Sequence, residues 1–349
     1  MSPSTISRAA AAVTLLASTT NAAFNAGSTA NVAMYWGQGP NQAPLTTACA
    51  DESIDVVNVA FVNGFPAKIG DWPATNFGNA CYDYYKHPTD STQDNKLLRT
   101  CPSIENGIKL CQKNGKKVLL SLGGGAPTSY YFPSEAVAKY TAEFLMGAFG
   151  PVTPAWTANN GPRPFGDSFV DGFDLDLEAE VNNVPRPEDI KAHYAYFVNQ
   201  LKVIQPSLLI SAAPQCEVPD VRLADAIKGA PFDMIFTQFY NTPKCSARAG
   251  ISEPNNVEGF SFKKWADWLQ ANSFKQDVKL YIGLPASPAA APSYPDHHLS
   301  PNEAYTLANQ WKQAYPGKFG GIMLWEDKRS RDNEINCGNY GSWMKAILN

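Results

Sequence analysis

The feature that most constrains the fold is a series of short apolar segments that recurs from residue 32 to residue 325. Apart from the segment 170–177, the segments are apolar on both of their faces, which is typical of parallel strands that are covered on both sides. Helix-like stretches separate the segments, as in units where a helix returns the chain to the next parallel strand. The eight segments are residues 32–36, 56–62, 117–122, 170–177, 208–213, 234–239, 279–284 and 321–325.

Eight strand-and-helix units without a break in composition favour a closed α/β barrel, the (β/α)8 or TIM-barrel fold, over an open sheet. We expect helices over residues 134–149, where Ser134 provides a cap, and over residues 187–205, where Pro187 suits the first helical position. Residues 71–95, rich in Asn, Asp, Tyr and Pro, predict a long loop held by Cys81. No linker indicates a second module, so residues 24–349 are predicted to be one catalytic domain.

Residues 1–23 have the layout of a secretory signal peptide. Arg8 precedes the apolar run 9–17, and small residues follow up to Ala22 and Ala23, where we expect cleavage. The apolar run is too short to span a bilayer. The sequence therefore predicts a secreted, extracellular protein with no membrane association.

Charge and cysteine content narrow the choice of partners. The formal net charge is -4, and no run of Lys or Arg could neutralise a phosphate backbone, so nucleic acid is not an expected partner. Disulfides are expected because a secreted protein meets an oxidising compartment, while the absence of a Cys-x-x-Cys pair argues against zinc. We expect no metal and no cofactor. The seven cysteines are Cys49, Cys81, Cys101, Cys111, Cys216, Cys245 and Cys337.

The candidate chemistry lies in the acidic strand 171–178. Side chains two apart share a face of a strand, so Asp174, Asp176 and Glu178 point into the barrel and the intervening apolar residues point out. Crowded carboxyl groups raise at least one pKa, as a general acid requires. Glu178 ends the strand, where barrel chemistry occurs, so it is predicted to be the acid.

Asp171 has the opposite parity and is predicted to be a structural acid at the floor of the barrel. Two other interpretations of the acidic strand remain open at this point. The strand end could bind water or cap a loop, or its carboxylates could hold a divalent metal.

Residues 171–178, Asp-Gly-Phe-Asp-Leu-Asp-Leu-Glu, resemble the Asp-x-x-Asp-x-Asp-x-Glu signature of the family 18 glycoside hydrolases. Residues 121–125 resemble the third-strand motif of that family. Residues 35–38, 212–216, 238–241 and 323–325 resemble strand ends of its class III, hevamine-like chitinases of the secreted fungal and plant type. The resemblance covers nearly the whole chain after residue 23.

The resemblance implies a role for each catalytic residue. Glu178 would donate a proton to the glycosidic oxygen and later activate water, Asp176 would orient the acetamido group of the substrate, and Asp174 would share a proton with Asp176. Tyr240 would bind the acetamido carbonyl, whose oxygen attacks the anomeric carbon with retention of configuration. Such substrate assistance departs from the scheme with two enzyme carboxylates.

The resemblance also implies the binding residues and the cysteine pairing. Tyr35, Gly124, Gln238, Asn241 and Trp325 would bind the sugar, with Trp325 as the floor beneath it. The implied disulfides are Cys49–Cys111, Cys81–Cys101 and Cys216–Cys245, with Cys337 left over. The implied substrate is chitin and its N-acetylglucosamine oligosaccharides, cleaved by an endo-acting monomer.

Two alternatives to a chitinase stay open. An endo-β-N-acetylglucosaminidase that acts on glycoproteins would use the same residues, and a catalytically silent barrel lectin or inhibitor would lack turnover. The extended segment 153–167 and the charged segment 326–332 depart from the family pattern, and we expect either one to be able to reshape the groove.

Overall fold

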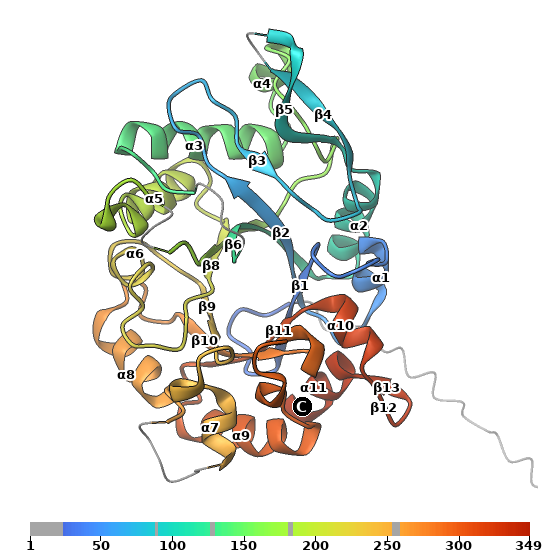
Figure 1. Cartoon of the computed structure of the whole chain (residues 1–349), viewed down its shortest axis with the longest axis vertical. Coiled ribbons are helices and arrows are strands. Elements are labelled where there is room, and N and C mark those ends of the chain that lie inside the picture. Colours follow the sequence, from blue (N-terminus) through green and yellow to red (C-terminus); the bar gives the residue numbers. More distant parts are fainter. Residues whose placement is uncertain (1–23, 88–89, 126–129, 181–183, 253–258) are drawn as a thin grey trace, which may run out of the picture.

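The computed structural model describes residues 24–87, 90–125, 130–180, 184–252 and 259–349 (Figure 1). The predicted signal peptide, residues 1–23, lies outside these described residues. No helix of the described ranges is both long enough and apolar enough to cross a membrane.

The described strands form the predicted (β/α)8 barrel. The strand β1 pairs in parallel with β11 on one side and with β2 on the other, which closes the sheet. The eight parallel strands are β1 (Asn31–Trp36), β2 (Val56–Gly64), β6 (Lys117–Gly124), β7 (Gly172–Leu177), β8 (Leu209–Ala212), β9 (Met234–Gln238), β10 (Lys279–Pro285) and β11 (Phe319–Trp325). The short strand β3 (Ala74–Thr75) adds an antiparallel partner to β2.

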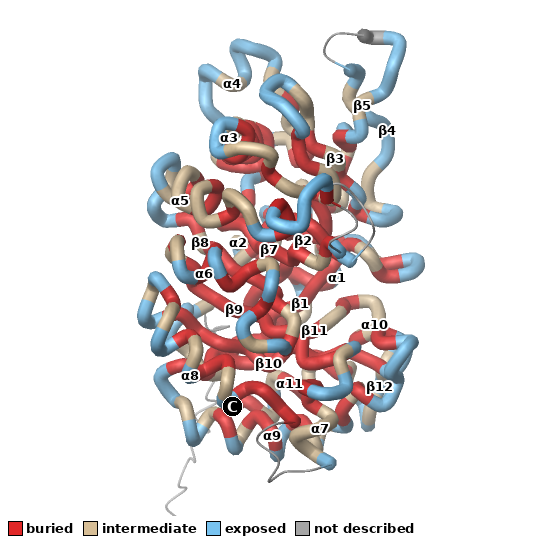
Figure 2. The backbone as a smooth tube through the Cα atoms, turned by 60° about the vertical axis from the view of Figure 1, so that its left-hand side comes forward, coloured by how far each residue is buried: buried red, intermediate tan, exposed pale blue. Residues whose placement is uncertain are grey.

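The barrel has one core inside the sheet and a second core between the sheet and the surrounding helices. Tyr35, Phe236, Tyr281 and Met323 belong to the inner core, and the outward-facing apolar residues of the strands pack on the helices. Figure 2 shows the barrel strands as the most deeply buried part of the chain. The helices are α1 (Leu45–Ala50), α2 (Pro102–Lys113), α3 (Glu135–Phe149), α4 (Pro154–Ala158), α5 (Tyr194–Ile204), α6 (Ala224–Gly229), α7 (Ala247–Ser252), α8 (Phe262–Asn272), α9 (Pro301–Ala314), α10 (Asp327–Asp332) and α11 (Tyr340–Leu348).

The prediction of a long loop over residues 71–95 is wrong. This part of the chain contains β3 and β4 (Tyr82–His87), and β4 pairs with β5 (Asp90–Thr100) as an antiparallel hairpin. Tyrosines favour a strand, and the disulfide Cys81–Cys101 ties the two ends of the hairpin together, which outweighs the polar composition. The hairpin projects from the barrel at the top of Figure 1.

The predicted helix over residues 187–205 is interrupted. A 3₁₀ turn covers Pro187–Ile190, and α5 begins only at Tyr194. His193 adopts a left-handed backbone conformation with φ 64°, which an α-helix cannot contain. Pro187 does occupy the first position, but of the 3₁₀ turn. The prediction for α3 holds, since Ser134 caps it by accepting a hydrogen bond from the Val137 N–H.

The two segments expected to affect the groove differ in position. Within residues 153–167, Trp156 packs edge-on against Phe144 of α3, and Arg163 donates to the carbonyl oxygens of Gly147 and Gly150. This segment therefore lies against the outer surface of the barrel, and α4 lies at the edge of Figure 1. The charged segment 326–332 instead forms α10 directly after the carboxyl end of β11.

Candidate active site

The acidic residues of β7 occupy the inside of the barrel. Asp174 and Asp176 are buried, at 0% and 3% exposed, and Glu178 follows the last residue of the strand at the carboxyl-terminal face. Phe173, Leu175 and Leu177 point outward into the core between the sheet and the helices. Because side chains alternate along a strand, the apolar residues of β7 pack between the sheet and the helices, and its acidic residues face the inside of the barrel.

Asp174 is the deepest of the three carboxyl groups. Its Oδ2 accepts hydrogen bonds from the Tyr35 hydroxyl at 2.7 Å and the Ser121 hydroxyl at 2.6 Å, and its Oδ1 accepts one from the Ser211 hydroxyl at 2.7 Å. Burial raises the pKa of Asp174, and the three hydroxyl donors oppose that rise by stabilising the carboxylate. These bonds fix the side chain as an acceptor at the centre of the barrel.

Asp176 and Glu178 form a coupled pair. Burial raises the pKa of Asp176 well above its usual value, and the neighbouring Glu178 carboxyl raises it further. The Oδ1 atom of Asp176 accepts a hydrogen bond from Gln238 Nε2 at 2.8 Å. Burial also raises the pKa of Glu178, while hydrogen bonding from Gln238 and the positive charge of Arg222 lower it. A proton is therefore retained on the pair to higher pH than on free carboxyl groups.

The backbone of Glu178 is held by a tyrosine of the β6–α3 connection. The Tyr130 hydroxyl accepts a hydrogen bond from the Glu178 N–H at 2.7 Å and donates one to the Gly124 carbonyl at 2.8 Å. Gln215, at the end of β8, places its Nε2 atom 3.5 Å from Glu178 Oε2. These contacts restrict both the position of the acid and the direction of its carboxyl group.

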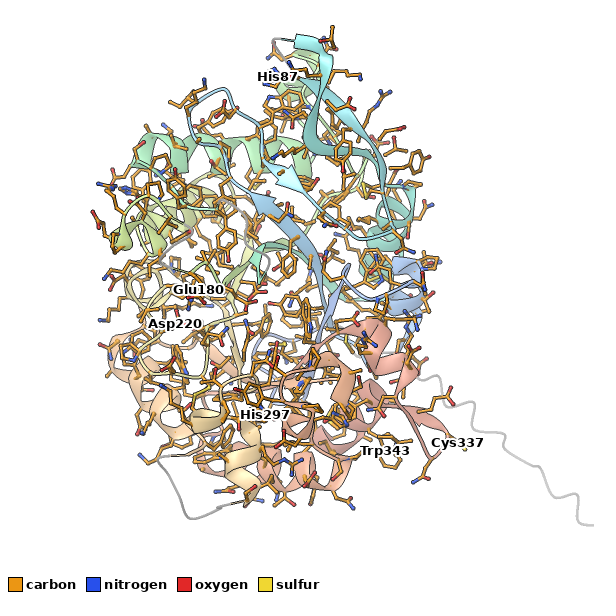
Figure 3. The ribbon with its side chains drawn as sticks, viewed as in Figure 1. His87, Glu180, Asp220, His297, Cys337 and Trp343 are labelled. Atoms are coloured by element: carbon orange, nitrogen blue, oxygen red, sulfur yellow. A yellow bond between two sulfur atoms is a disulfide. The ribbon has the colours of Figure 1, made fainter. Side chains whose placement is uncertain are left out.

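A second set of contacts acts on the residue after Glu178. Asp220 accepts hydrogen bonds from the backbone N–H groups of Gln215, Arg222 and Leu223 at 3.0, 2.8 and 2.8 Å, which builds the connection between β8 and α6. Arg222 Nε then donates to the Ala179 carbonyl at 2.7 Å. Figure 3 labels Asp220 and Glu180, both in the left half of the view.

A pocket of about 190 Å³ opens above the acid pair. Trp325 lies on one side of it and packs against the rings of Tyr35 and Phe61 at centroid distances of 5.6 and 6.1 Å. Burial raises the pKa of Tyr240 well above its usual value, so its hydroxyl remains a hydrogen-bond donor. The pocket is lined by Tyr35, Gly125, Asp176, Glu178, Ala213, Gln238, Tyr240, Asn241, Met323 and Trp325.

The structure brings most predicted site residues to this pocket, but not all of them. The Tyr35 ring reaches the pocket while its hydroxyl is bonded to Asp174. Gly124 lies against the Phe61 ring, and its neighbour Gly125 lines the pocket instead. Asp171 lies before β7, where it accepts hydrogen bonds from Lys117 Nζ at 3.0 Å and the Val118 N–H at 3.0 Å.

The sequence interpretation assigned no role to Ser121, Ser211, Tyr130, Gln215 or Arg222. Parity could have identified the two serines, since they face inward on the strands beside Asp174. Tyr130 and Arg222 belong to connections whose conformation no periodicity specifies. Among the described residues, no group of three or more His, Cys, Asp or Glu side chains is arranged to hold a metal ion.

The cysteines pair as the family resemblance implied. The disulfides are Cys49–Cys111, Cys81–Cys101 and Cys216–Cys245, and Cys337 is an exposed free thiol. The Cys216–Cys245 bond joins the connections that follow β8 and β9. It therefore braces the rim of the barrel next to Gln215 and Asn241.

A closed (β/α)8 barrel with an acid pair and aromatic walls at the carboxyl ends of its strands is the architecture of a barrel glycosidase. Residues 31–330 match the model of the glycosyl hydrolases family 18. The chain belongs to glycoside hydrolase family 18.

Similar proteins include enzymes and an inhibitor. Endochitinase A1 of Aspergillus fumigatus is 44% identical over 349 residues, which cover 98% of this chain and 40% of that protein, so the chain spans about two fifths of this relative. The ICChI chitinase of Ipomoea carnea superposes with a TM-score of 0.69 at 28% identity, covering 91% of this chain and 99% of the other. The xylanase and alpha-amylase inhibitor XAIP-II of Scadoxus multiflorus superposes with a TM-score of 0.67 at 28% identity, covering 91% of this chain and 97% of the other.

Proposed function

We propose that this protein is an endo-acting chitinase that hydrolyses β-1,4-linked N-acetylglucosamine polymers with retention of configuration. The observation that carries the proposal is the acid pair Asp176 and Glu178, which retains a proton at the mouth of the barrel and faces Tyr240 across one pocket. The similarity to a fungal endochitinase over 98% of the chain supports the choice of polymer.

In the proposed mechanism Glu178 donates its proton to the glycosidic oxygen as the bond to the anomeric carbon breaks. The carbonyl oxygen of the substrate's own acetamido group attacks that carbon, so a cyclic intermediate forms and no enzyme nucleophile is needed. Glu178, now ionised, then removes a proton from water, which opens the intermediate. Two displacements at one carbon leave its configuration unchanged.

Asp176 and Tyr240 have supporting roles in this scheme. Asp176, held by Gln238 Nε2, would accept the hydrogen bond of the acetamido N–H and stabilise the positive charge that develops on the ring. The Tyr240 hydroxyl would donate to the acetamido oxygen and aim it at the anomeric carbon. Trp325 would support the apolar face of the sugar, since indole rings present a large apolar surface with fixed geometry.

The test is product analysis on a defined N-acetylglucosamine hexamer, with Glu178→Gln as the matched variant. An endo-acting chitinase releases dimers, trimers and tetramers, and the variant is expected to lose at least about a thousandfold in kcat, because proton donation and water activation both fail. Cleavage of a high-mannose glycoprotein without cleavage of the hexamer would indicate an endo-β-N-acetylglucosaminidase. Binding of the hexamer without turnover would indicate a silent barrel.

We also infer that the protein is secreted as a monomer after cleavage of its signal peptide behind Ala22 or Ala23. Three disulfides among the described cysteines fit an oxidising compartment. N-terminal sequencing of protein recovered from culture medium is expected to begin at Ala23 or Phe24, and gel filtration is expected to give one chain per particle. An N-terminus at Met1 would contradict the inference.

A further inference from the structure

Glu326 is a buried acid that the proposed mechanism does not use. It follows Trp325 at the carboxyl end of β11, and it is 3% exposed. Trp325 lines the catalytic pocket, whereas Glu326 is not among the lining residues. A buried carboxyl group costs free energy unless hydrogen bonds compensate for the lost water. The contacts of Glu326 therefore indicate what this residue does.

The Glu326 carboxylate caps α10. Its Oε1 atom accepts a hydrogen bond from the Arg329 N–H at 3.0 Å, and its Oε2 atom accepts one from the Lys328 N–H at 3.0 Å. The Glu326 carbonyl accepts a third bond, from the Ser330 N–H at 2.9 Å. Burial raises the pKa of Glu326, while the N–H groups of Lys328 and Arg329 lower it. The start of α10 thus fixes both the backbone and the side chain of Glu326.

The same carboxylate lies against the connection that follows β1. A Cβ atom on Gly39 would collide with Glu326 Oε2 and with Lys328 Cβ, so the two segments approach closely at this glycine. Figure 1 shows α10 beside β1 and β11. These two strands carry Tyr35 and Trp325, whose rings pack at a centroid distance of 5.6 Å in the catalytic pocket. The cap therefore joins the ends of two strands that supply aromatic rings to the pocket.

The backbone of Trp325 is also held from its other side. Its carbonyl accepts a hydrogen bond from the Ala286 N–H at 2.7 Å. The Ala286 carbonyl accepts one at 3.0 Å from Nδ2 of Asn333, the residue that follows the last turn of α10. Both ends of α10 are therefore attached to the backbone around Trp325. Because the ring of Trp325 packs on Tyr35 and Phe61, a shift of this backbone would change the wall of the pocket.

We propose that Glu326 is a positioning residue that sets the orientation of Trp325 toward the bound N-acetylglucosamine unit. Glu326 fixes the direction in which the chain leaves β11, and the indole ring of Trp325 then presents its apolar face to the sugar. This inference rests on the proposed function, because it takes the N-acetylglucosamine polymer as the ligand of the pocket.

The test is a double-mutant cycle on Glu326 and Trp325. Calorimetry measures the binding of an N-acetylglucosamine hexamer in a Glu178→Gln background, which prevents hydrolysis. Glu326→Ala is expected to weaken binding about tenfold when Trp325 is present, and less than about twofold when Trp325→Ala has already removed the ring. Equal losses in the two backgrounds would show that Glu326 does not act through Trp325 and would overturn the proposal.

Two further variants separate the cap from general stability. Glu326→Asp keeps a carboxylate at a position where Asp is a preferred residue, so it is expected to bind the hexamer within about threefold of the parent. Thr153→Ala removes the cap of α4, where the Thr153 hydroxyl accepts from the Trp156 N–H on the outer surface of the barrel, and it is expected to leave binding unchanged. A loss in either variant as large as in Glu326→Ala would overturn the proposal.

The last measurement uses the active enzyme. Since the Trp325 ring supports the sugar both before and during bond cleavage, Glu326→Ala is expected to raise KM for the hexamer about tenfold and to lower kcat less than about threefold. A fall in kcat at unchanged KM would overturn the proposal. If the parent enzyme binds the hexamer without cleaving it, the proposed function fails, while the double-mutant cycle still tests the role of Glu326.

Discussion

Arg222 offers the sharpest test of how the pocket controls its acid. Its guanidinium donates to the carbonyl of Ala179, the residue after Glu178, and its positive charge lowers the pKa of Glu178. A positive charge close to a carboxyl group favours its ionised form. Replacement by a neutral residue therefore raises the pKa of Glu178.

The assay is the pH profile of kcat/KM on a chitin oligomer for Arg222→Gln and Arg222→Lys. The alkaline limb reports loss of the acid's proton in the free enzyme. In Arg222→Gln this limb moves to higher pH, because Glu178 keeps its proton to higher pH. In Arg222→Lys it stays in place, because the charge is retained.

Both variants lose part of the contact with Ala179, so both are expected to lower kcat. A decrease in kcat that both variants share therefore reports the position of Glu178, whereas a shift of the alkaline limb in Arg222→Gln alone reports the charge. The charge argument is wrong if Arg222→Gln lowers kcat and leaves the alkaline limb where it is in the parent enzyme. It is equally wrong if Lys and Gln move the limb by the same amount.

Three further predictions concern catalysis and stability. Asp176→Asn is expected to lower kcat by about a hundredfold or more and to change the affinity for a non-hydrolysed oligomer much less, since the charge matters most in the transition state. Single-turnover kinetics measure the loss of kcat and calorimetry measures the loss of affinity. Equal losses in the two measurements would count against the role assigned to Asp176. The pKa of Glu303 is lowered to about 2, mainly by hydrogen bonding from Arg248, so its stabilising contribution is complete above pH 4.5 and is lost as the pH falls toward 2. Because solvent screens this partly exposed ion pair, Glu303→Gln should cost about 1 kcal/mol in urea unfolding at pH 7 and little near pH 2, and a cost independent of pH would refute this linkage. Removal of the Cys81–Cys101 disulfide, which closes a separation of 20 residues, should cost about 3 kcal/mol in the same assay, and an unchanged urea midpoint would contradict it.

Much of the fold follows from local pattern in the sequence. The segment 279–284 illustrates why, since its run of apolar residues has no alternation and only a strand covered on both sides can bury all of them. The alternation in residues 171–178 is equally informative, because a period of two places Asp174, Asp176 and Glu178 on one face whatever the rest of the chain does. Position at the carboxyl end of the strand then singles out Glu178.

The remaining features depend on contacts between distant parts of the chain. Nothing local indicates that Tyr130 bonds the Glu178 N–H, because the two residues are 48 positions apart and are brought together by the pairing of β6 with β7. The sequence does not predict the hairpin β4–β5, because its strands are polar and lack an alternation of apolar residues. Cross-strand pairing and a disulfide stabilise this hairpin. The break before α5 arises from the left-handed conformation of His193, which is not one of the residues that signal a turn.

In the proposed mechanism, the substrate's own acetamido oxygen is the nucleophile and Glu178 is the acid that assists it. Proton NMR during the first minutes of hydrolysis of an N-acetylglucosamine hexamer reports the configuration of the newly formed reducing end before it equilibrates. Retention of configuration gives the β-anomer as the first product, and an initial α-anomer would contradict the proposed mechanism.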